Sequence, residues 1–408
     1  MMSRFLIFFL FLYSSYASAQ EVSQSTLLDC AQKHVIHPRG NMRNSYLKFE
    51  KKRTGRVAFL GGSITEMKGW RDMIEEHLQQ RFPNTSFDFI RAGIASTGST
   101  PGAFRLKNDV LRQEGDGPVD LLFVEAAVND DTNGFDYIAQ TRGMEGIIRQ
   151  ARINNPEMDI VMLHFIYDPF IELHKTGRLP DVVYNHERVA NHYQIPSIDL
   201  VTEINRRMAD GEFTWEMFGG THPAPLGHTC YANAIKCLFD ILWQNIGLNS
   251  WPRPHRVPAQ PLDTFSYFDG DFLDIQNARL SNGWELIPVW RTDDKAGKRN
   301  LFVDVPMLEA TTPGATLTLD FEGRAIGLFC VCGPSAATIE YSIDNAPFRQ
   351  LDTYTQWSSN LYIPWAYILD DQLSSEAPHQ LILRISEEKN PASEGHALQI
   401  RNFLINKK

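Results

Sequence analysis

The sequence predicts a two-domain protein in which a three-layer α/β/α domain with a parallel sheet is followed by an all-β sandwich. In residues 55–248, short apolar runs alternate with segments of helical periodicity, a pattern typical of a doubly wound parallel sheet. Prolines gather in residues 249–262 and indicate a linker. Residues 263–408 contain short alternating runs separated by turn signals such as Pro313-Gly314, as in sandwich domains. A chain of 408 residues also exceeds one ordinary core.

The first 19 residues have the pattern of a secretory signal peptide. Arg4 supplies a basic start, Phe5 to Tyr13 is an unbroken apolar run, and Ala17-Ser18-Ala19 matches the small-residue cleavage pattern. The apolar run is too short to span a bilayer, which takes about 20 residues. We therefore expect cleavage near Ala19, export to the periplasm or the extracellular space, and no membrane insertion. Residues 20–54 then form a polar lead-in.

The spacing of apolar residues predicts where the helices and strands of the first domain lie. A buried strand ends at Gly61-Gly62, just before Ser63, and we expect the domain to continue as alternating helices and strands. Residues 166–180 are predicted to be a long loop. The helices are expected at 69–82, 137–153, 181–193, 200–209 and 226–244, and the further strands at 86–91, 119–125, 159–165 and 195–199.

The formal charge of −10 argues against nucleic acid or an anionic membrane surface as the main partner. It selects no substrate, and the sequence leaves the oligomeric state open.

The five cysteines show no metal-ligand spacing. Cys230 and Cys237 lie on one predicted helix, roughly 10 Å apart by helical rise and too far apart to bridge each other. Cys330 and Cys332 share one face of a predicted strand and are also poorly placed to pair. We interpret all five, Cys30 included, mainly as small buried hydrophobic residues, and a bridge between two different elements stays open.

Four short blocks lie at the ends of predicted strands or after the last one: Gly61-Gly62-Ser63-Ile64-Thr65, Ala92-Gly93-Ile94, Val128-Asn129-Asp130 and Thr221-His222-Pro223. The carboxyl ends of parallel strands meet at one edge of the sheet, where open α/β proteins bind ligands. In chain order the blocks supply Ser, Gly, Asn and His. This resembles the SGNH/GDSL hydrolase superfamily of flavodoxin-like esterases, over about residues 55–244.

The resemblance implies a role for each block. Ser63 would attack an ester carbonyl, and His222 would take its proton and return it to the leaving alcohol. The N–H groups of Ser63 and Gly93 and the side-chain amide of Asn129 would form the oxyanion hole. No metal or organic cofactor is implied.

One position departs from the superfamily. Its members usually carry an acid three residues before the histidine, and this chain has Gly219 there. A backbone carbonyl that accepts from Nδ1 would still hold the useful tautomer, which gives a Ser–His dyad. Among carboxylates, Glu216 is the leading substitute, and Asp168, Asp199 and Glu125 are further candidates.

Export, acidity and an appended β domain suggest a large extracellular substrate. Similar two-domain members of the superfamily are carbohydrate esterases, so we expect a secreted serine esterase that removes O-acetyl groups from a polysaccharide or oligosaccharide. Tyr167 and Asp168 are expected to line the cleft. Trp357 is expected to stack on a sugar ring, and the alternative is that it packs in the core of the sandwich. The alternatives are a lipase or lysophospholipase, and, because of Gly219, a glycan-binding protein with a vestigial hydrolase domain.

Overall fold

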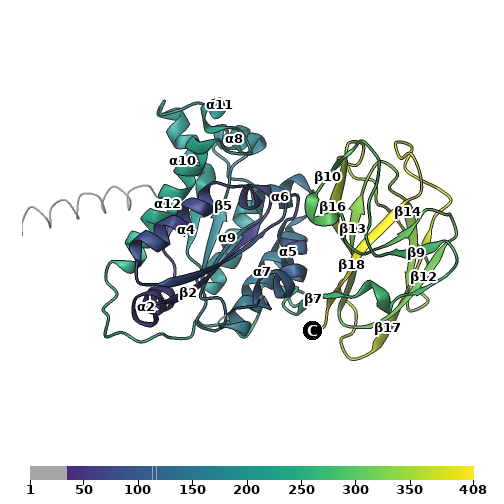
Figure 1. Ribbon diagram of the computed structural model, residues 1–408, viewed down its shortest axis with the longest axis horizontal. Helices are drawn as coiled ribbons and strands as arrows, with labels where there is room; N and C mark the ends of the chain where they lie inside the picture. Colours follow the sequence, from purple (N-terminus) through teal and green to yellow (C-terminus); the bar gives the residue numbers. More distant parts are fainter. Residues whose placement is uncertain (1–34, 113, 116) are drawn as a thin grey trace, which may run out of the picture.

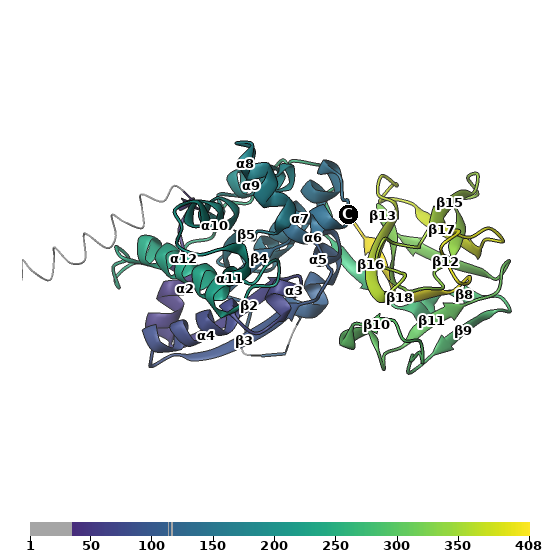
Figure 2. The same ribbon diagram turned by 90° about the horizontal axis from the view of Figure 1, so that it is seen from above.

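The computed structural model describes residues 35–112, 114–115 and 117–408. These residues form two lobes that lie side by side, an α/β domain and an all-β domain, as Figures 1 and 2 show. This confirms the predicted fold class. The expected signal peptide lies outside the described residues.

The α/β domain is built around a parallel sheet. In the described part of the chain it contains six strands in the order β1-β6-β5-β4-β2-β3, and all pairs are parallel except β1 with β6. The five parallel strands, numbered along the chain, therefore follow the flavodoxin-like order 2-1-3-4-5. The strands are β1 (Ile36–His37), β2 (Thr54–Gly61), β3 (Ser86–Gly93), β4 (Leu121–Glu125), β5 (Asp159–His164) and β6 (Ser197–Asp199).

Helices cover both faces of this sheet because its strands are apolar on both faces. Val57 and Phe59 of β2 pack in the core beneath α4 and α12, whereas Ala58 and Leu60 pack in the core beneath α5 and α7. No helix in the described residues combines the length and apolarity needed to span a bilayer. The helical elements are α2 (Arg43–Leu47), η1 (Lys48–Lys52), α3 (Ser63–Glu66), α4 (Trp70–Arg81), α5 (Ser99–Leu106), η2 (Lys107–Leu111), α6 (Ala127–Thr132), α7 (Tyr137–Asn154), α8 (Asp168–Lys175), α9 (Asp181–Tyr193), α10 (Leu200–Ala209), α11 (Trp215–Phe218) and α12 (Pro225–Trp243).

The predicted loop over residues 166–180 is wrong in part, because α8 occupies its middle. Pro169 lies in the first turn of this helix, a position that proline favours. Phe170 is the only side chain of α8 that is fully buried. The helix is only eight residues long, which is too short a stretch for apolar spacing alone to indicate a helix.

At one cysteine the structure shows the bridge that the sequence analysis left open. Cys237 takes part in a disulfide, whereas Cys230, Cys330 and Cys332 are free and buried. The spacing of the cysteines in the sequence did not indicate which of them takes part in a bridge. Cys30 lies outside the described residues.

The second domain is a sandwich of two sheets. In residues 263–408, all of which are described, the sheets follow the orders β10-β16-β13-β18-β11-β9, with β7 beside β18, and β15-β14-β17-β12-β8. The apolar side chains between the sheets form a core of their own. The elements are β7 (Gly270–Leu273), η3 (Ile275–Asn277), β8 (Arg279–Leu280), β9 (Trp284–Ile287), β10 (Gly297–Lys298), η4 (Asn300–Phe302), β11 (Met307–Ala310), β12 (Thr316–Glu322), β13 (Ala325–Cys332), β14 (Thr338–Ile343), β15 (Arg349–Asp352), β16 (Leu361–Asp370), β17 (Pro378–Ile385) and β18 (Leu398–Asn406).

The two domains share an apolar core. Strand β13 is buried on both faces: Leu328 and Cys330 point into the sandwich, and Phe329 and Val331 pack in the same cluster as residues of α5 and α7. The seven-stranded sheet thus has its outer face covered by the α/β domain. Their relative position is consequently fixed by packing and not by the linker alone.

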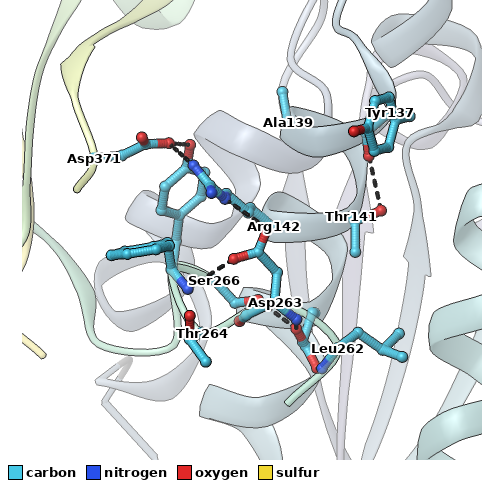
Figure 3. A network of polar contacts seen from close by, with 12 residues as sticks. Tyr137, Ala139, Thr141, Arg142, Leu262, Asp263, Thr264, Ser266 and Asp371 are labelled. Carbon is cyan, nitrogen blue, oxygen red and sulfur yellow. Dashed lines mark hydrogen bonds and ion pairs between the residues drawn. The ribbon is translucent and has the colours of Figure 1, made fainter.

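Polar contacts flank this shared core. Arg142 of α7 binds Asp263 at 2.9 Å and Asp371 of the β domain at 2.5 Å, and its side chain is only 8% exposed (Figure 3). This guanidinium is withdrawn from water, and the two carboxylates accept its hydrogen bonds and stabilise its charge.

Candidate active site

The structure brings Ser63 and His222 together although 159 residues separate them in the chain. Ser63 is the first residue of α3, directly after β2 and Gly62, and His222 lies in the turn between α11 and α12. The distance between Ser63 Oγ and His222 Nε2 is 2.9 Å. An imidazole nitrogen at this distance can accept the hydroxyl proton and so activate the serine as a nucleophile.

The surroundings of His222 favour the neutral imidazole. Partial burial and, second, the positive charge of Arg299 lower the pKa of His222 below its ordinary value of 6.5. In the described part of the chain, the ring makes one hydrogen bond, to Ser63. A base must be unprotonated to act, so this electrostatic environment extends its working range toward lower pH.

The turn that carries Ser63 is held by a buried carboxylate. Glu125 Oε1, at the end of β4, accepts from the N–H of Gly62 at 2.6 Å and from Thr65 Oγ1 at 2.7 Å. Burial raises the pKa of Glu125 to about 7. A Cβ at position 61 would lie 2.1 Å from this carboxylate, so the turn requires glycine there. Glu125 therefore supports Ser63 and does not contact His222.

Gly93 and Asn129 lie on either side of the serine turn. Gly93 ends β3 and pairs in register with Gly61, and a Cβ on it would lie 2.4 Å from the backbone nitrogen of Glu66 in α3. Similarly, a Cβ on Gly62 would lie 1.9 Å from Asn129 Oδ1. The backbone at 93 and the amide of Asn129 can therefore approach Ser63 only because these positions are glycines.

A buried residue that the sequence analysis missed stabilises the Asn129 side of the site. Asp130 is fully buried and accepts from the N–H of Ser99 at 2.7 Å, which fixes the start of α5. It also lies 3.0 Å from His186 Nε2 on α9. Asp130 belongs to the block Val128-Asn129-Asp130, but its partners come from distant segments, so no sequence pattern indicated a role for it.

The candidate acids do not reach His222. Glu216 is exposed on α11 and accepts from Thr214 Oγ1 at 3.1 Å. Asp199 instead caps α10, where it accepts from the N–H of Thr202 at 3.0 Å and from its hydroxyl at 2.6 Å. Among the described residues, no carboxylate makes a hydrogen bond to the His222 ring.

The turn before His222 explains why glycine stands at position 219. Gly219 ends α11 with φ of +105°, and a Cβ on it would lie 2.0 Å from the backbone nitrogen of Ala224. That nitrogen donates to the carbonyl of Phe218 at 2.8 Å and closes the turn. An aspartate at 219 would therefore require both an unfavourable φ and a rearranged turn.

Asp168 and Tyr167 connect the two sides of the site. Asp168 accepts from Trp215 Nε1 at 2.9 Å and from Thr221 Oγ1 at 3.0 Å, so it ties the start of α8 to the residue before His222. The Tyr167 hydroxyl donates to the carboxylate of Asp131, two residues after Asn129. Of the three predicted substrate residues, Tyr167 and Asp168 thus contact the segments that carry Asn129 and His222, respectively.

A cavity of about 690 Å³ opens next to these residues, between the two domains. Residues 131–134 and Tyr167 line one wall, and the β domain lines the other with Tyr354, Trp357, Trp365 and Tyr367. Trp357 is 44% exposed. Gln356 Nε2 donates to the carbonyl of Thr132 at 2.8 Å and joins the walls. The described residues contain no group of three or more His, Cys, Asp and Glu arranged to hold a metal ion.

Comparison with protein families identifies a hydrolase domain. Residues 59–230 match the model of the GDSL-like lipase/acylhydrolase family. This range contains Ser63, Gly93, Asn129 and His222, and the match confirms the superfamily expected from the sequence. The search among curated proteins found no match.

Solved structures show the same two-domain fold. A two-domain esterase, CEX, described as active on acetylated mannans, is 20% identical with a TM-score of 0.72, and the match covers 92% of this chain and 99% of that one. Its complex with mannopentaose is 19% identical with a TM-score of 0.70 and covers 92% and 98%. An acetylxylan esterase from Geobacillus stearothermophilus, Axe2, is 17% identical and matches 45% of this chain and 94% of its own, with a TM-score of 0.36.

Proposed function

We propose that this chain, a carboxylic ester hydrolase with a domain of the GDSL-like lipase/acylhydrolase family, removes O-acetyl groups from a polysaccharide or oligosaccharide. The observation that carries the proposal is the 2.9 Å contact between Ser63 Oγ and His222 Nε2 at the end of β2. Gly93 and Asn129 beside this pair supply donors of the kind that a tetrahedral intermediate needs.

In the proposed reaction, Ser63 Oγ attacks the acetyl carbonyl while His222 Nε2 takes the hydroxyl proton. The resulting oxyanion accepts from the N–H groups of Ser63 and Gly93 and from the side-chain amide of Asn129. His222 then gives its proton to the departing sugar oxygen, which leaves an acetyl group on Ser63. A water molecule, deprotonated by His222, attacks this ester and releases acetate, and the proton returns to Ser63.

The base would work without a hydrogen-bonded carboxylate. Asp168 instead holds the segment that carries His222, through Trp215 and Thr221. We infer a Ser–His dyad in which Asp168 acts as a positioning residue, and Glu216 has no part in the chemistry.

The interdomain cavity supports a glycan substrate. It combines aromatic faces, among them Trp357 and Trp365, with the carboxylates of Asp131 and Asp352. Aromatic faces stack on the apolar faces of sugar rings, and carboxylates accept from sugar hydroxyls, whereas a long acyl chain would gain nothing from those carboxylates. The shared fold with an esterase described as active on acetylated mannans supports the same substrate class. The signal-like pattern of residues 1–19 supports export, where such polymers are found.

The test is acetate release from acetylated mannan and acetylated xylan, together with hydrolysis of p-nitrophenyl acetate and octanoate. We expect acetate from at least one glycan and faster cleavage of the acetyl ester. Ser63→Ala should lose on the order of 10⁴-fold or more in kcat, and the exposed β-domain substitution Ser375→Ala should change nothing. Faster cleavage of octanoate would favour a lipase. Equal activity in wild type and Ser63→Ala would indicate a vestigial hydrolase domain.

A further inference from the structure

We propose that Arg299 of the β domain is part of the hydrolase site, where it positions the loop after Gly93 and presents a positive charge to His222. This inference rests on the proposed esterase function. It assigns to the β domain an electrostatic role in the reaction, besides any part in binding glycan.

The backbone around Arg299 is anchored on both sides. It follows β10, which pairs with β16, and the N–H of Gly297 donates to the carbonyl of Asn360 at 2.8 Å. It precedes η4, whose Phe302 is buried in the core shared by the two domains. Figures 1 and 2 both place β10 on the side of the β domain that faces the α/β domain. The side chain therefore starts from a fixed position at the interface.

Arg299 reaches the loop that follows the oxyanion candidate Gly93. Its Nη2 donates to Ser96 Oγ at 3.0 Å. Ser96 has a φ of +70°, a conformation that non-glycine residues keep only when surrounding contacts impose it. From within the hydrolase domain, the loop is held by the N–H of Ile94 on the Gly61 carbonyl at 2.9 Å and by Asn133 Nδ2 on the Ser96 carbonyl at 3.1 Å. Arg299 adds the contact from the second domain.

The positive charge of Arg299 also acts on the His222 imidazole. After burial, Arg299 is the cause that lowers the pKa of His222. The other charged groups on the elements around His222 are engaged elsewhere. Among the carboxylates, Asp168 accepts from Trp215 and Thr221, Glu216 from Thr214, Glu66 from the N–H of Ala95, and Glu125 from Gly62 and Thr65. Among the guanidiniums, Arg71 pairs with Asp72 and Glu75, and Arg105 pairs with Asp109.

Arg299 also has N–H groups that no described residue accepts a hydrogen bond from. Its Nε is buried and finds no hydrogen-bond partner among the described residues. A guanidinium carries five N–H donors, and the described partner, Ser96, takes one of them. The same cation that disfavours protonated His222 favours the negative charge that develops on the substrate carbonyl oxygen.

Three variants test the inference. Arg299→Gln removes the charge, Arg299→Lys keeps it, and Arg291→Gln is a matched control because Arg291 is an exposed arginine of the same domain that pairs with Asp304. We expect Arg299→Gln to lower kcat/KM for p-nitrophenyl acetate about 10-fold at pH 8, the value of one charge-assisted hydrogen bond. Its acid limb should move to higher pH, because His222 protonates more easily. Arg299→Lys should restore the position of the limb, and Arg291→Gln should match wild type.

A measurement independent of activity separates this inference from the proposed function. The pKa of His222 is read by NMR from ¹³C-labelled histidine, with His222→Gln to assign the signal. A higher pKa in Arg299→Gln, reversed in Arg299→Lys, supports the inference even if the wild type cleaves no ester, in which case only the proposed function fails. An unchanged pKa in folded Arg299→Gln would overturn the inference even if the wild type is an active esterase.

Discussion

The two domains differ in the polar groups that they bury. The α/β domain buries carboxylates, guanidiniums and imidazoles, such as Glu125, Asp130 and His186. Most buried polar side chains of the β domain are hydroxyls and amides, and its buried Asp271 pairs with Arg112 of the α/β domain at 2.7 Å. Burying a charge costs more than burying a hydroxyl. The α/β domain accepts this cost at both edges of its sheet, with Glu125 beside the serine turn and Asp159 at the start of β5, and in the β domain Asp271 accepts it at the interface.

Removing the buried charge at the interface should have the largest effect. Arg142→Ala leaves Asp263 and Asp371 without their shared cation, and we expect a loss of about 3–5 kcal/mol in the free energy of unfolding. Urea unfolding measures this loss of stability. Arg279→Ala is the control, because Arg279 pairs with Asp320 on the surface of the β domain, and it should leave the midpoint unchanged. Equal midpoints for the two variants would contradict the contrast between buried and exposed pairs.

Removing the proposed oxyanion donor Asn129 should affect the rate and not the fold. Asn129→Ala is expected to lower kcat by about 10²–10³-fold with little change in KM, because the amide acts mainly on the transition state. Steady-state kinetics with p-nitrophenyl acetate checks this. Asn191→Ala, at an exposed position on α9, serves as the control. A change confined to KM would indicate that Asn129 binds substrate instead.

The buried carboxylate beneath the serine turn should make stability depend on pH. Burial raises the pKa of Glu125 from 4.5 to about 7, so its contribution to stability is fully present below pH 4.5 and is lost as the pH rises through 7. Glu125→Gln keeps an oxygen acceptor for Gly62 and Thr65 without this loss. Relative to wild type, the variant should gain up to roughly 3 kcal/mol between pH 4.5 and pH 7.5. Parallel stability curves from urea unfolding would show that Glu125 does not titrate in this range.

Glycine substitutions in the turn before His222 should give the smallest change in stability. Gly219→Ala should cost roughly 1–3 kcal/mol of stability, because its Cβ would meet the Ala224 nitrogen at positive φ. Gly220→Ala should cost less, since a Cβ there meets no atom within 4 Å although φ is +77°. Thermal unfolding of the two variants measures this difference in stability. For the same reason, Gly219→Asp should not raise activity, and a gain would show that the turn tolerates the family's acid.

The sequence predicted the main-chain framework of the site well. Ser63 and Asn129 come shortly after a strand and Gly93 ends one, the apolar runs of these strands are easily recognised, and parallel strands end at the same edge of a sheet. The beginnings and ends of the long helices were also close, as for α9, because their apolar periodicity is strong.

What the sequence did not predict depends on contacts between distant residues. The bond of Asp130 to His186 and the bond of Arg299 to Ser96 join segments that carry no shared pattern, and the cysteine spacing did not assign the disulfide of Cys237. The helix α8 was missed because its eight residues are fewer than the window over which apolar periodicity can be recognised.

Covalent labelling can identify the proposed nucleophile. The full-length protein is treated with an alkyl fluorophosphonate and digested, and the modified peptide is identified by mass spectrometry. The account predicts a single adduct on Ser63, which forms much more slowly in His222→Ala because the hydroxyl has lost its base. An adduct on another serine, or none on Ser63 in the folded protein, would contradict it.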